Sequence, residues 1–325
     1  MIVGLDIGYS NLKVCFGTSN KDMSKHVFPV GVVIDDRRDG LRGTTPKGSE
    51  IVKVDEQQYI ACLSPSDIAL DYQRVLLENY PETIEYKALL HASLIKTKSS
   101  VIDLIVTGLP VDQFITPGKR EALTQLIKGT HEVFEGVFVE VKDVIVVPQP
   151  LGSYSLETSS NDDLLDSLVL VLDPGFFSVD WAVMQDGNLL RGALGTSKLA
   201  ISSIYEEAVR LIRNETGGRT NINMIEKAIV HQREYIKVFG ERVQLTPFLE
   251  QATVSISSNI KKELESVLRK SNIDIDYVLL TGGGSMLYKN IAKEMFPHSK
   301  TITTNEYVLS NAKGFYQIAK DLRDE

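Results

Sequence analysis

The hydrophobic positions at the start of the chain alternate with polar ones, which is the two-residue period of β-strands. An apolar run over residues 2–7 is followed by a polar turn at 8–11, and alternation resumes over residues 12–16. This pattern predicts two strands joined by a turn that contains Gly8. Comparable runs predict further strands in the first half of the chain, at 25–33, in a hairpin at 50–62, at 101–109 and in two runs within 133–147.

Apolar residues spaced three and four positions apart predict the helices. In the first half they span residues 83–96 and 117–128, and a third helix begins at 151. The acidic, polar string SSNDD at 159–163 marks a boundary between two domains. In the second half the predicted helices are 197–215, 223–232 with Asn221 as its N-cap, 246–270, 286–295 and 309–322.

A pattern of three successive strands occurs twice along the chain. The apolar run at 168–172 leads into Asp173-Pro174-Gly175, and two alternating segments follow at 179–184 and 188–194. Asp173 follows Asp6 by 167 residues, about half of the chain length. A repeat of this length predicts two similar domains that face each other, rather than a solenoid.

Each repeated turn carries residues suited to a phosphate group. Small residues let backbone N–H groups approach a phosphate closely, and Lys13 lies just beyond the first turn. Asp6 and Asp173 supply carboxylates, which together with water are ligands that Mg²⁺ prefers. Two such turns could clamp a polyphosphate and its Mg²⁺ from both sides. For either turn alone, an ordinary hairpin with a turn carboxylate remains an alternative.

A run of glycines follows a short strand predicted at 277–280. The string TGGGS at 281–285 joins this strand to a predicted helix. This arrangement is compatible with nucleotide binding, because bare backbone admits a close ligand and helix N-termini favour anions. The same glycines could also form no more than the entry turn of the helix.

Composition narrows the class of protein. The 325 residues are 43% hydrophobic and 24% charged, which is typical of a globular chain of about two domains. The net charge of −8 argues against a molecule-wide field that binds nucleic acid. Cys15 and Cys62 fit no metal-binding spacing and are predicted to be reduced core residues. Neither a signal peptide nor an apolar run of ~20 residues is found, so we expect a soluble, cytoplasmic protein.

The ordered strings LDIGYSNLK, VVPQPLG, LDPGFFSVD and VLLTGGGS resemble the actin-like ATPase superfamily. The chain length and the strings GLPVDQF, INMIEKA and SNAKGFYQIA look most like its ParM (StbA) branch, the plasmid-segregation actins of bacteria. The resemblance implies an α/β fold of duplicated, ribonuclease H-like domains, each a mixed sheet flanked by helices, with a nucleotide cleft between them. Domain I would span 1–158, with a small insert at about 30–95, and domain II would span 159–308. The helix at 309–325 would pack back on domain I.

The resemblance also implies which residues bind ATP and Mg²⁺. Asp6 and Asp173 would hold Mg²⁺ through water, and Gln149 matches the position that orients the attacking water. These three residues are the expected catalytic set. Glu226 and Lys227 lie on the helix that often flanks the adenine and ribose in the family, with a solvated helix face as an equal alternative. The nucleotide would further contact Gly8, Tyr9, Ser10, Asn11 and Lys13 in the first phosphate motif, Gly175, Phe176 and Ser178 in the second, and Gly282, Gly283 and Gly284 in the adenosine motif.

The second phosphate motif departs from the family pattern. Family members usually have small polar residues where this chain has Phe176 and Phe177. We therefore expect the loop to bind phosphate through its backbone, with slow hydrolysis or an altered nucleotide preference as the consequence. Asp180 is expected to support the loop rather than to contact the ligand.

The function implied by the resemblance is an ATPase that polymerises into a polar, open-ended filament. Such filaments push plasmids apart through a DNA-bound adaptor protein, without direct binding to nucleic acid or membrane. ATP is the expected nucleotide, with GTP as a possible substitute. The exposed-looking segments at 35–50 and 233–245 are candidate polymer contacts. Two alternatives remain: a nucleotide-dependent scaffold without hydrolysis, favoured by the two phenylalanines, and a small-molecule kinase of the same fold with Asp112 as its catalytic residue.

Overall fold

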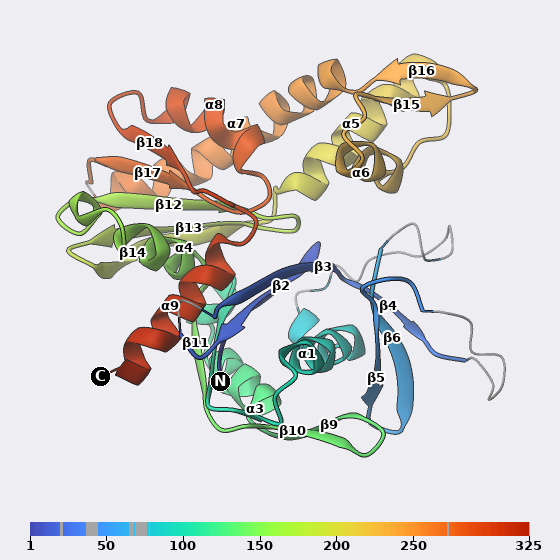
Figure 1. The fold of residues 1–325 in the computed structure, drawn as a ribbon. Coiled ribbons are helices and arrows are strands. Elements are labelled where there is room, and N and C mark those ends of the chain that lie inside the picture. The colour runs from blue at the N-terminus through green and yellow to red at the C-terminus, as the bar shows by residue number, and fades with distance from the viewer. Residues whose placement is uncertain are drawn as a thin grey trace. The chain divides into compact units, whose positions relative to one another are not determined.

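The computed structural model describes residues 1–19, 22–36, 45–64, 68, 77, 79–271 and 273–324. These residues form two compact units (Figure 1). Unit 1 comprises Met1–Leu164 and Thr304–Glu325, and unit 2 comprises Leu165–Thr303. Residues 37–44 of the loop predicted at 35–50 lie outside the described residues.

The central sheet of unit 1 has five strands in the order β11-β8-β1-β2-β3. The predicted hairpin is confirmed as β1 (Ile2–Ile7) and β2 (Asn11–Gly17), which pair antiparallel. β3 (Ser24–Pro29) continues this antiparallel arrangement on one side. On the other side β8 (Leu104–Leu109) runs parallel to β1, and β11 (Val144–Pro148) runs parallel to β8.

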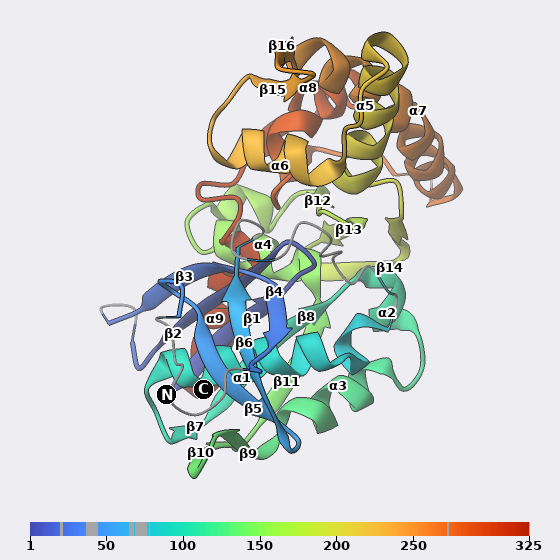
Figure 2. The ribbon, with the colours of Figure 1, turned by 90° about the vertical axis from the view of Figure 1, so that its right-hand side faces the viewer.

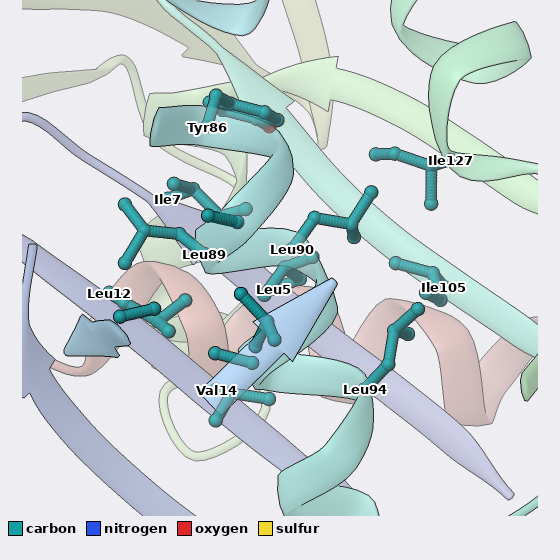
Figure 3. Close-up of a cluster of buried hydrophobic side chains, with 14 of the residues drawn as sticks. Leu5, Ile7, Leu12, Val14, Tyr86, Leu89, Leu90, Leu94, Ile105 and Ile127 are labelled. Carbon is teal, nitrogen blue, oxygen red and sulfur yellow. The ribbon is translucent and has the colours of Figure 1, made fainter. Parts of the chain in front are cut away.

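Successive residues of β1 point to opposite faces of this sheet. Both faces are therefore apolar, and helices cover each of them. On one face Leu5 packs in a cluster with Leu89 of α1 (Ile84–Thr97), as Figure 3 shows. On the other face Ile2 packs in a cluster with Phe315 of α9 (Ser310–Asp324). A Cβ on Gly4 would lie 2.1 Å from a backbone oxygen of α9, so only glycine allows this helix to lie directly on β1.

A second close contact joins α9 to α4 (Gln149–Thr158) in unit 1. A Cβ on Gly314 would lie 1.7 Å from the carbonyl oxygen of Gly152, so the two helix backbones touch where they cross. Beside this crossing the buried Ser153 hydroxyl donates a hydrogen bond to Ser310 Oγ at 3.0 Å. The helix predicted to begin at residue 151 is present as α4, and it begins two residues earlier, at Gln149.

Two small sheets complete unit 1. One has the order β4-β6-β5 and the other β7-β10-β9. The single strand predicted at 25–33 is wrong: β3 ends at Pro29, which cannot donate a ladder hydrogen bond, and the chain enters another sheet with Gly31. The short helix at 111–115 was not predicted. The remaining elements are β4 (Gly31–Ile34), β5 (Glu50–Val54), β6 (Gln57–Leu63), β7 (Val101–Ile102), β9 (Gly129–Phe134), β10 (Val137–Val141), α2 (Val111–Ile115), α3 (Lys119–Ile127), and the 3-10 turns at Tyr80–Glu82 and Asp162–Leu164.

Unit 2 repeats the strand arrangement of unit 1. Its sheet has the order β14-β13-β12-β17-β18, with antiparallel pairing from β12 to β14 and parallel pairing from β12 to β18. In both units the first strand is therefore central, with its hairpin partner on one side and a parallel strand on the other. This confirms the predicted duplication. The strands are β12 (Val169–Pro174), β13 (Val179–Gln185), β14 (Asn188–Ser197), β17 (Tyr277–Leu280) and β18 (Lys300–Thr303).

The helices predicted in unit 2 are present, but the first of them begins at Ile201 rather than at residue 197, because β14 continues to Ser197. α5 (Ile201–Thr216) and α7 (Thr246–Ser271) pack against each other (Figure 2). Asn221 is confirmed as an N-cap, since its side chain accepts a hydrogen bond from the Met224 N–H at 3.0 Å. The segment at 233–245, which the sequence predicts to be exposed, contains an antiparallel hairpin, and Phe239 at its turn is 82% exposed. The further elements are α6 (Ile222–Val230), β15 (Tyr235–Val238), β16 (Glu241–Gln244) and α8 (Ser285–Met295).

Two expectations from composition can be compared with the structure. Cys15 and Cys62 are free, buried thiols, as predicted, and burial raises the pKa of each to about 12. Among the described helices, none combines the length and the apolar character that crossing a membrane requires.

One half-buried histidine predicts a loss of stability in mild acid. The pKa of His91 falls from 6.5 to about 4, mainly through burial, against a hydrogen bond with the Lys53 carbonyl. His131 and Lys87 lower this pKa further, whereas Asp55 raises it. The unfolded chain binds this proton more readily than the folded chain does. The free energy of unfolding therefore decreases by up to ~3 kcal/mol as the pH falls from about 6.5 to about 4. Urea unfolding at pH 7.0 and 4.5 should show a smaller pH dependence in His91→Gln than in the wild-type protein. An identical dependence would contradict this assignment.

Candidate functional site

The first hairpin holds a buried ion pair at its turn. Asp6 and Lys13 lie opposite each other across β1 and β2, and Lys13 Nζ donates to Asp6 Oδ2 at 2.8 Å. Asp6 is only 2% exposed. The Gly8 N–H closes the turn by donating to the Asn11 carbonyl oxygen at 3.1 Å. A Cβ on Gly8 would lie 3.6 Å from Lys13 Nζ, so the turn backbone passes directly beside the ion pair.

Packing within unit 1 supports this turn. The Tyr9 ring stacks on Tyr80, with centroids 4.7 Å apart, and its hydroxyl donates to the Leu77 carbonyl oxygen at 2.7 Å. Burial, together with the nearby Asp6 carboxylate, raises the pKa of Tyr86 well above its usual value, so this phenol stays protonated. The stacking on Tyr80 and the hydrogen bond to Leu77 are the contacts through which Tyr9 stabilises the turn within unit 1.

The second hairpin has the same turn in unit 2. Asp173 and Asp180 lie opposite each other across β12 and β13. The Gly175 N–H donates to the Ser178 carbonyl oxygen at 2.8 Å. Each of these four residues lies 167 positions after its counterpart in the first hairpin. The hydrogen bond that closes the turn is therefore repeated along with the strands.

The two hairpins differ in charge. Asp180 occupies the strand position that Lys13 occupies in the first hairpin. Its carboxylate accepts hydrogen bonds from Ser178 Oγ at 2.7 Å and from Thr196 Oγ1 at 2.5 Å. These bonds link the turn to β14, which agrees with the expected supporting role of Asp180. Thr196 was missed because nothing in its sequence surroundings indicates that β14 would pass beside this carboxylate.

The two phenylalanines of the second turn have separate contacts. The Phe176 ring packs edge-on against Tyr205 of α5, with centroids 6.2 Å apart. Lys198 Nζ lies over the Phe177 ring, 5.3 Å from its centroid. Neither side chain prevents the backbone of the turn from closing as it does in the first hairpin.

The glycine run after β17 lies against the second hairpin. Gly282 has a φ of +74°, and a Cβ at this position would lie 2.0 Å from Asp173 Oδ1. The Gly284 N–H donates to the Pro174 carbonyl oxygen at 2.8 Å. At Gly283 a Cβ would meet no atom within 4 Å, so its surroundings are open. Two motifs more than 100 residues apart in sequence are thus brought together within unit 2.

The other candidate residues lie on helices. Gln149 is the half-buried first residue of α4, and a Cβ on Gly108 would lie 2.9 Å from its Cγ. On α6 of unit 2, Glu226 is half-buried and Lys227 is exposed. Asp112 accepts a hydrogen bond from the adjacent Gln113 N–H at 2.8 Å, in the first turn of α2. Among the described residues, no three metal-ligating side chains gather in one place.

Two family models match consecutive parts of the chain. Residues 4–152 match the actin-like proteins N-terminal domain, and residues 171–294 match the C-terminal domain of the archaeal, MreB-like actin homologue. The first match contains the turn of the first hairpin and Gln149, and the second contains the turn of the second hairpin and the glycine run. Both models describe actin-like domains, and together they span most of the chain.

Solved structures of actin-like proteins have the same fold as this chain. The archaeal actin homologue Ta0583 matches with a TM-score of 0.79 and 16% identity, over 98% of this chain and 99% of that one. Ta0583 has also been solved in complex with ADP. No curated protein matches the sequence significantly.

ParM structures match almost as well. A non-polymerisable quadruple mutant of pCBH ParM gives a TM-score of 0.74 at 19% identity, over 98% of this chain and 99% of that one. A ParM from a 15-stranded filament of Clostridium botulinum gives 0.72 at 18% identity, with the same coverage. The predicted actin-like fold and the resemblance to ParM-type proteins are thereby confirmed.

Proposed function

We propose that this chain is an ATPase that uses both repeated hairpins to bind one ATP and its Mg²⁺, and that it assembles into filaments. The observation that carries the proposal is the repeated turn. Gly8 and Gly175 donate the same closing hydrogen bond, and a buried carboxylate, Asp6 or Asp173, precedes each by two residues. This repeat lies in an actin-like fold, and the actin homologue Ta0583 has been solved with ADP.

The residues present fit a nucleotide with Mg²⁺. At Gly283 a Cβ would meet no atom within 4 Å, so bare backbone faces open space there, which suits a ligand that approaches closely. Asp6 and Asp173 are buried carboxylates, and Mg²⁺ is commonly held by one or two carboxylates together with phosphate oxygens and water. The bound ion would supply positive charge that offsets the charge of the phosphates.

Positioning and charge stabilisation account for most of the catalysis in phosphoryl transfer. Backbone N–H groups of the two turns bind phosphate oxygens, and Lys13 adds positive charge next to Asp6. The amide of Gln149 cannot accept a proton as a strong base, so it orients the attacking water. The adenosine lies on Gly282–Gly284, with Glu226 and Lys227 of α6 beside it.

Filament formation follows from the same comparison. ParM structures of this fold include a filament and a non-polymerisable quadruple mutant. Head-to-tail contacts between identical subunits are not closed by symmetry, so growth is open-ended. We further propose plasmid segregation through a DNA-bound adaptor, which suits a chain of net charge −8 that does not attract DNA itself.

The proposal is tested by sedimentation and light scattering with ATP, GTP, ADP and a non-hydrolysable ATP analogue, each with phosphate release measured in parallel. We expect polymer with ATP, followed by phosphate release and disassembly. Polymer without phosphate release would favour the scaffold alternative, and phosphate transfer only with an added metabolite would favour the kinase. The absence of polymer with every nucleotide would overturn the filament proposal.

The role of Gln149 gives a separate prediction. Gln149→Ala should reduce the rate of ATP hydrolysis ~100-fold, because one ordered contact to the water is lost, and should change ATP affinity less than about 3-fold. Filaments of the variant should persist longer after ATP is exhausted from solution. Gln125→Ala, on the exposed face of α3, is the matched control and should behave like the wild-type protein. Equal rates in both variants would exclude Gln149 from the reaction.

A further inference from the structure

A lysine from the third strand reaches the second turn. In the β13–β14 pair Ser197 lies opposite Val179, so the next residue, Lys198, comes beside the turn itself. Its Nζ lies 5.3 Å from the centroid of the Phe177 ring. This lysine is half-buried, and no motif in the sequence analysis pointed to it.

Backbone hydrogen bonds fix the segment that carries Lys198. The Ser202 N–H donates to the Phe176 carbonyl oxygen at 2.9 Å, and the Ile201 N–H donates to the Gly175 carbonyl oxygen at 3.3 Å. The start of α5 is therefore bound directly to the turn. Because of these bonds, the position of Lys198 relative to the turn is set by the backbone and not by its side chain alone.

The charges of the two hairpins indicate what Lys198 does. The first turn has one carboxylate, Asp6, paired with Lys13. The second has two buried carboxylates, Asp173 and Asp180, on neighbouring strands. Two carboxylates beside one turn repel a polyphosphate, and a cationic side chain at this turn would reduce that repulsion in addition to the bound Mg²⁺.

We propose that Lys198 is the phosphate-binding cation of the second turn and that the Phe177 ring holds it in position. This inference rests on the proposed binding of ATP. A lysine bound to an aromatic face is held weakly, whereas a bond from an ammonium to phosphate is charge-assisted and stronger. A phosphate of the nucleotide is therefore a stronger partner for Lys198 than the ring. The role of holding Lys198 would explain why Phe177, which departs from the family pattern, is aromatic.

The test measures the affinities of ATP, ADP and adenosine by calorimetry with Mg²⁺ present. Lys198→Gln should weaken ATP binding ~10-fold or more and ADP binding less, and should leave adenosine binding unchanged. Lys198→Arg should recover most of the loss. The control is Lys300→Gln, which removes the same kind of contact in unit 2, since Lys300 Nζ lies 5.1 Å from the Tyr277 ring centroid.

Phe177→Leu separates positioning from binding. It keeps the charge of Lys198 but removes the ring, so the loss of ATP affinity should be several-fold, with the salt dependence of binding retained. Lys198→Gln should instead reduce that salt dependence. Unchanged ATP affinity in Lys198→Gln, or an equal loss for adenosine, would overturn the inference while the proposed function stands. Failure of the wild-type protein to bind ATP would overturn the proposed function itself, and this inference with it.

Discussion

Replacing Gly282 by alanine is expected to abolish detectable ATP binding and hydrolysis. The new Cβ would lie 2.0 Å from Asp173 Oδ1 and 3.2 Å from the Pro174 carbonyl oxygen, both in the second hairpin. The φ of +74° adds a cost of ~1–2 kcal/mol for a residue with a side chain. Since Asp173 and the glycine run must both move apart, the phosphate and adenosine motifs are disturbed together. We expect ATP affinity to fall at least ~100-fold.

Gly192→Ala is the matched control for this prediction. Gly192 lies on β14 of the same unit, and a Cβ there would meet no atom within 4 Å. ATP binding to both variants can be followed by calorimetry, with circular dichroism to establish that each is folded. ATP affinity in Gly282→Ala within about 3-fold of the control would contradict the contact between these two motifs.

The second large effect concerns stability. Gly314→Ala should destabilise the protein by about 3 kcal/mol, although alanine favours a helix by ~1 kcal/mol over glycine. The reason is the crossing of α4 and α9, where the added Cβ would lie 1.7 Å from the carbonyl oxygen of Gly152. The two helices must separate, which disturbs the buried bond between Ser153 and Ser310.

Urea unfolding measures this effect directly. Gln317→Ala, on the same helix, removes an exposed side-chain hydrogen bond to Asp321 Oδ1 and should alter the free energy of unfolding by less than ~1 kcal/mol. A Gly314→Ala variant as stable as the wild-type protein would show that the two helices are not in backbone contact.

The parts of the fold that sequence analysis predicted correctly are those encoded locally. The alternation around Gly8 and around Gly175 is visible within about 17 residues, and its recurrence after 167 residues indicated the duplicated sheet. The break between β3 and β4 was missed because apolar residues continue through Pro29. Periodicity reports which residues are apolar, but not which sheet a strand joins.

The contacts that the sequence could not predict are tertiary. Thr196 and Lys198 come to the second turn through the pairing of β13 with β14, and Tyr205 meets Phe176 through the position of α5. From sequence, Phe176 and Phe177 predict phosphate binding through the loop backbone, with slow hydrolysis or an altered nucleotide preference. In the structure they pack against Tyr205 and Lys198, and the turn keeps its closing hydrogen bond.

The central claim is that the two repeated hairpins bind one nucleotide jointly. Calorimetric titration of the unpolymerised protein with the non-hydrolysable ATP analogue and Mg²⁺ tests it most directly. We predict one nucleotide per chain, with the affinity lost in both Asp6→Ala and Asp173→Ala. Two nucleotides per chain, or full affinity in either variant, would contradict the account.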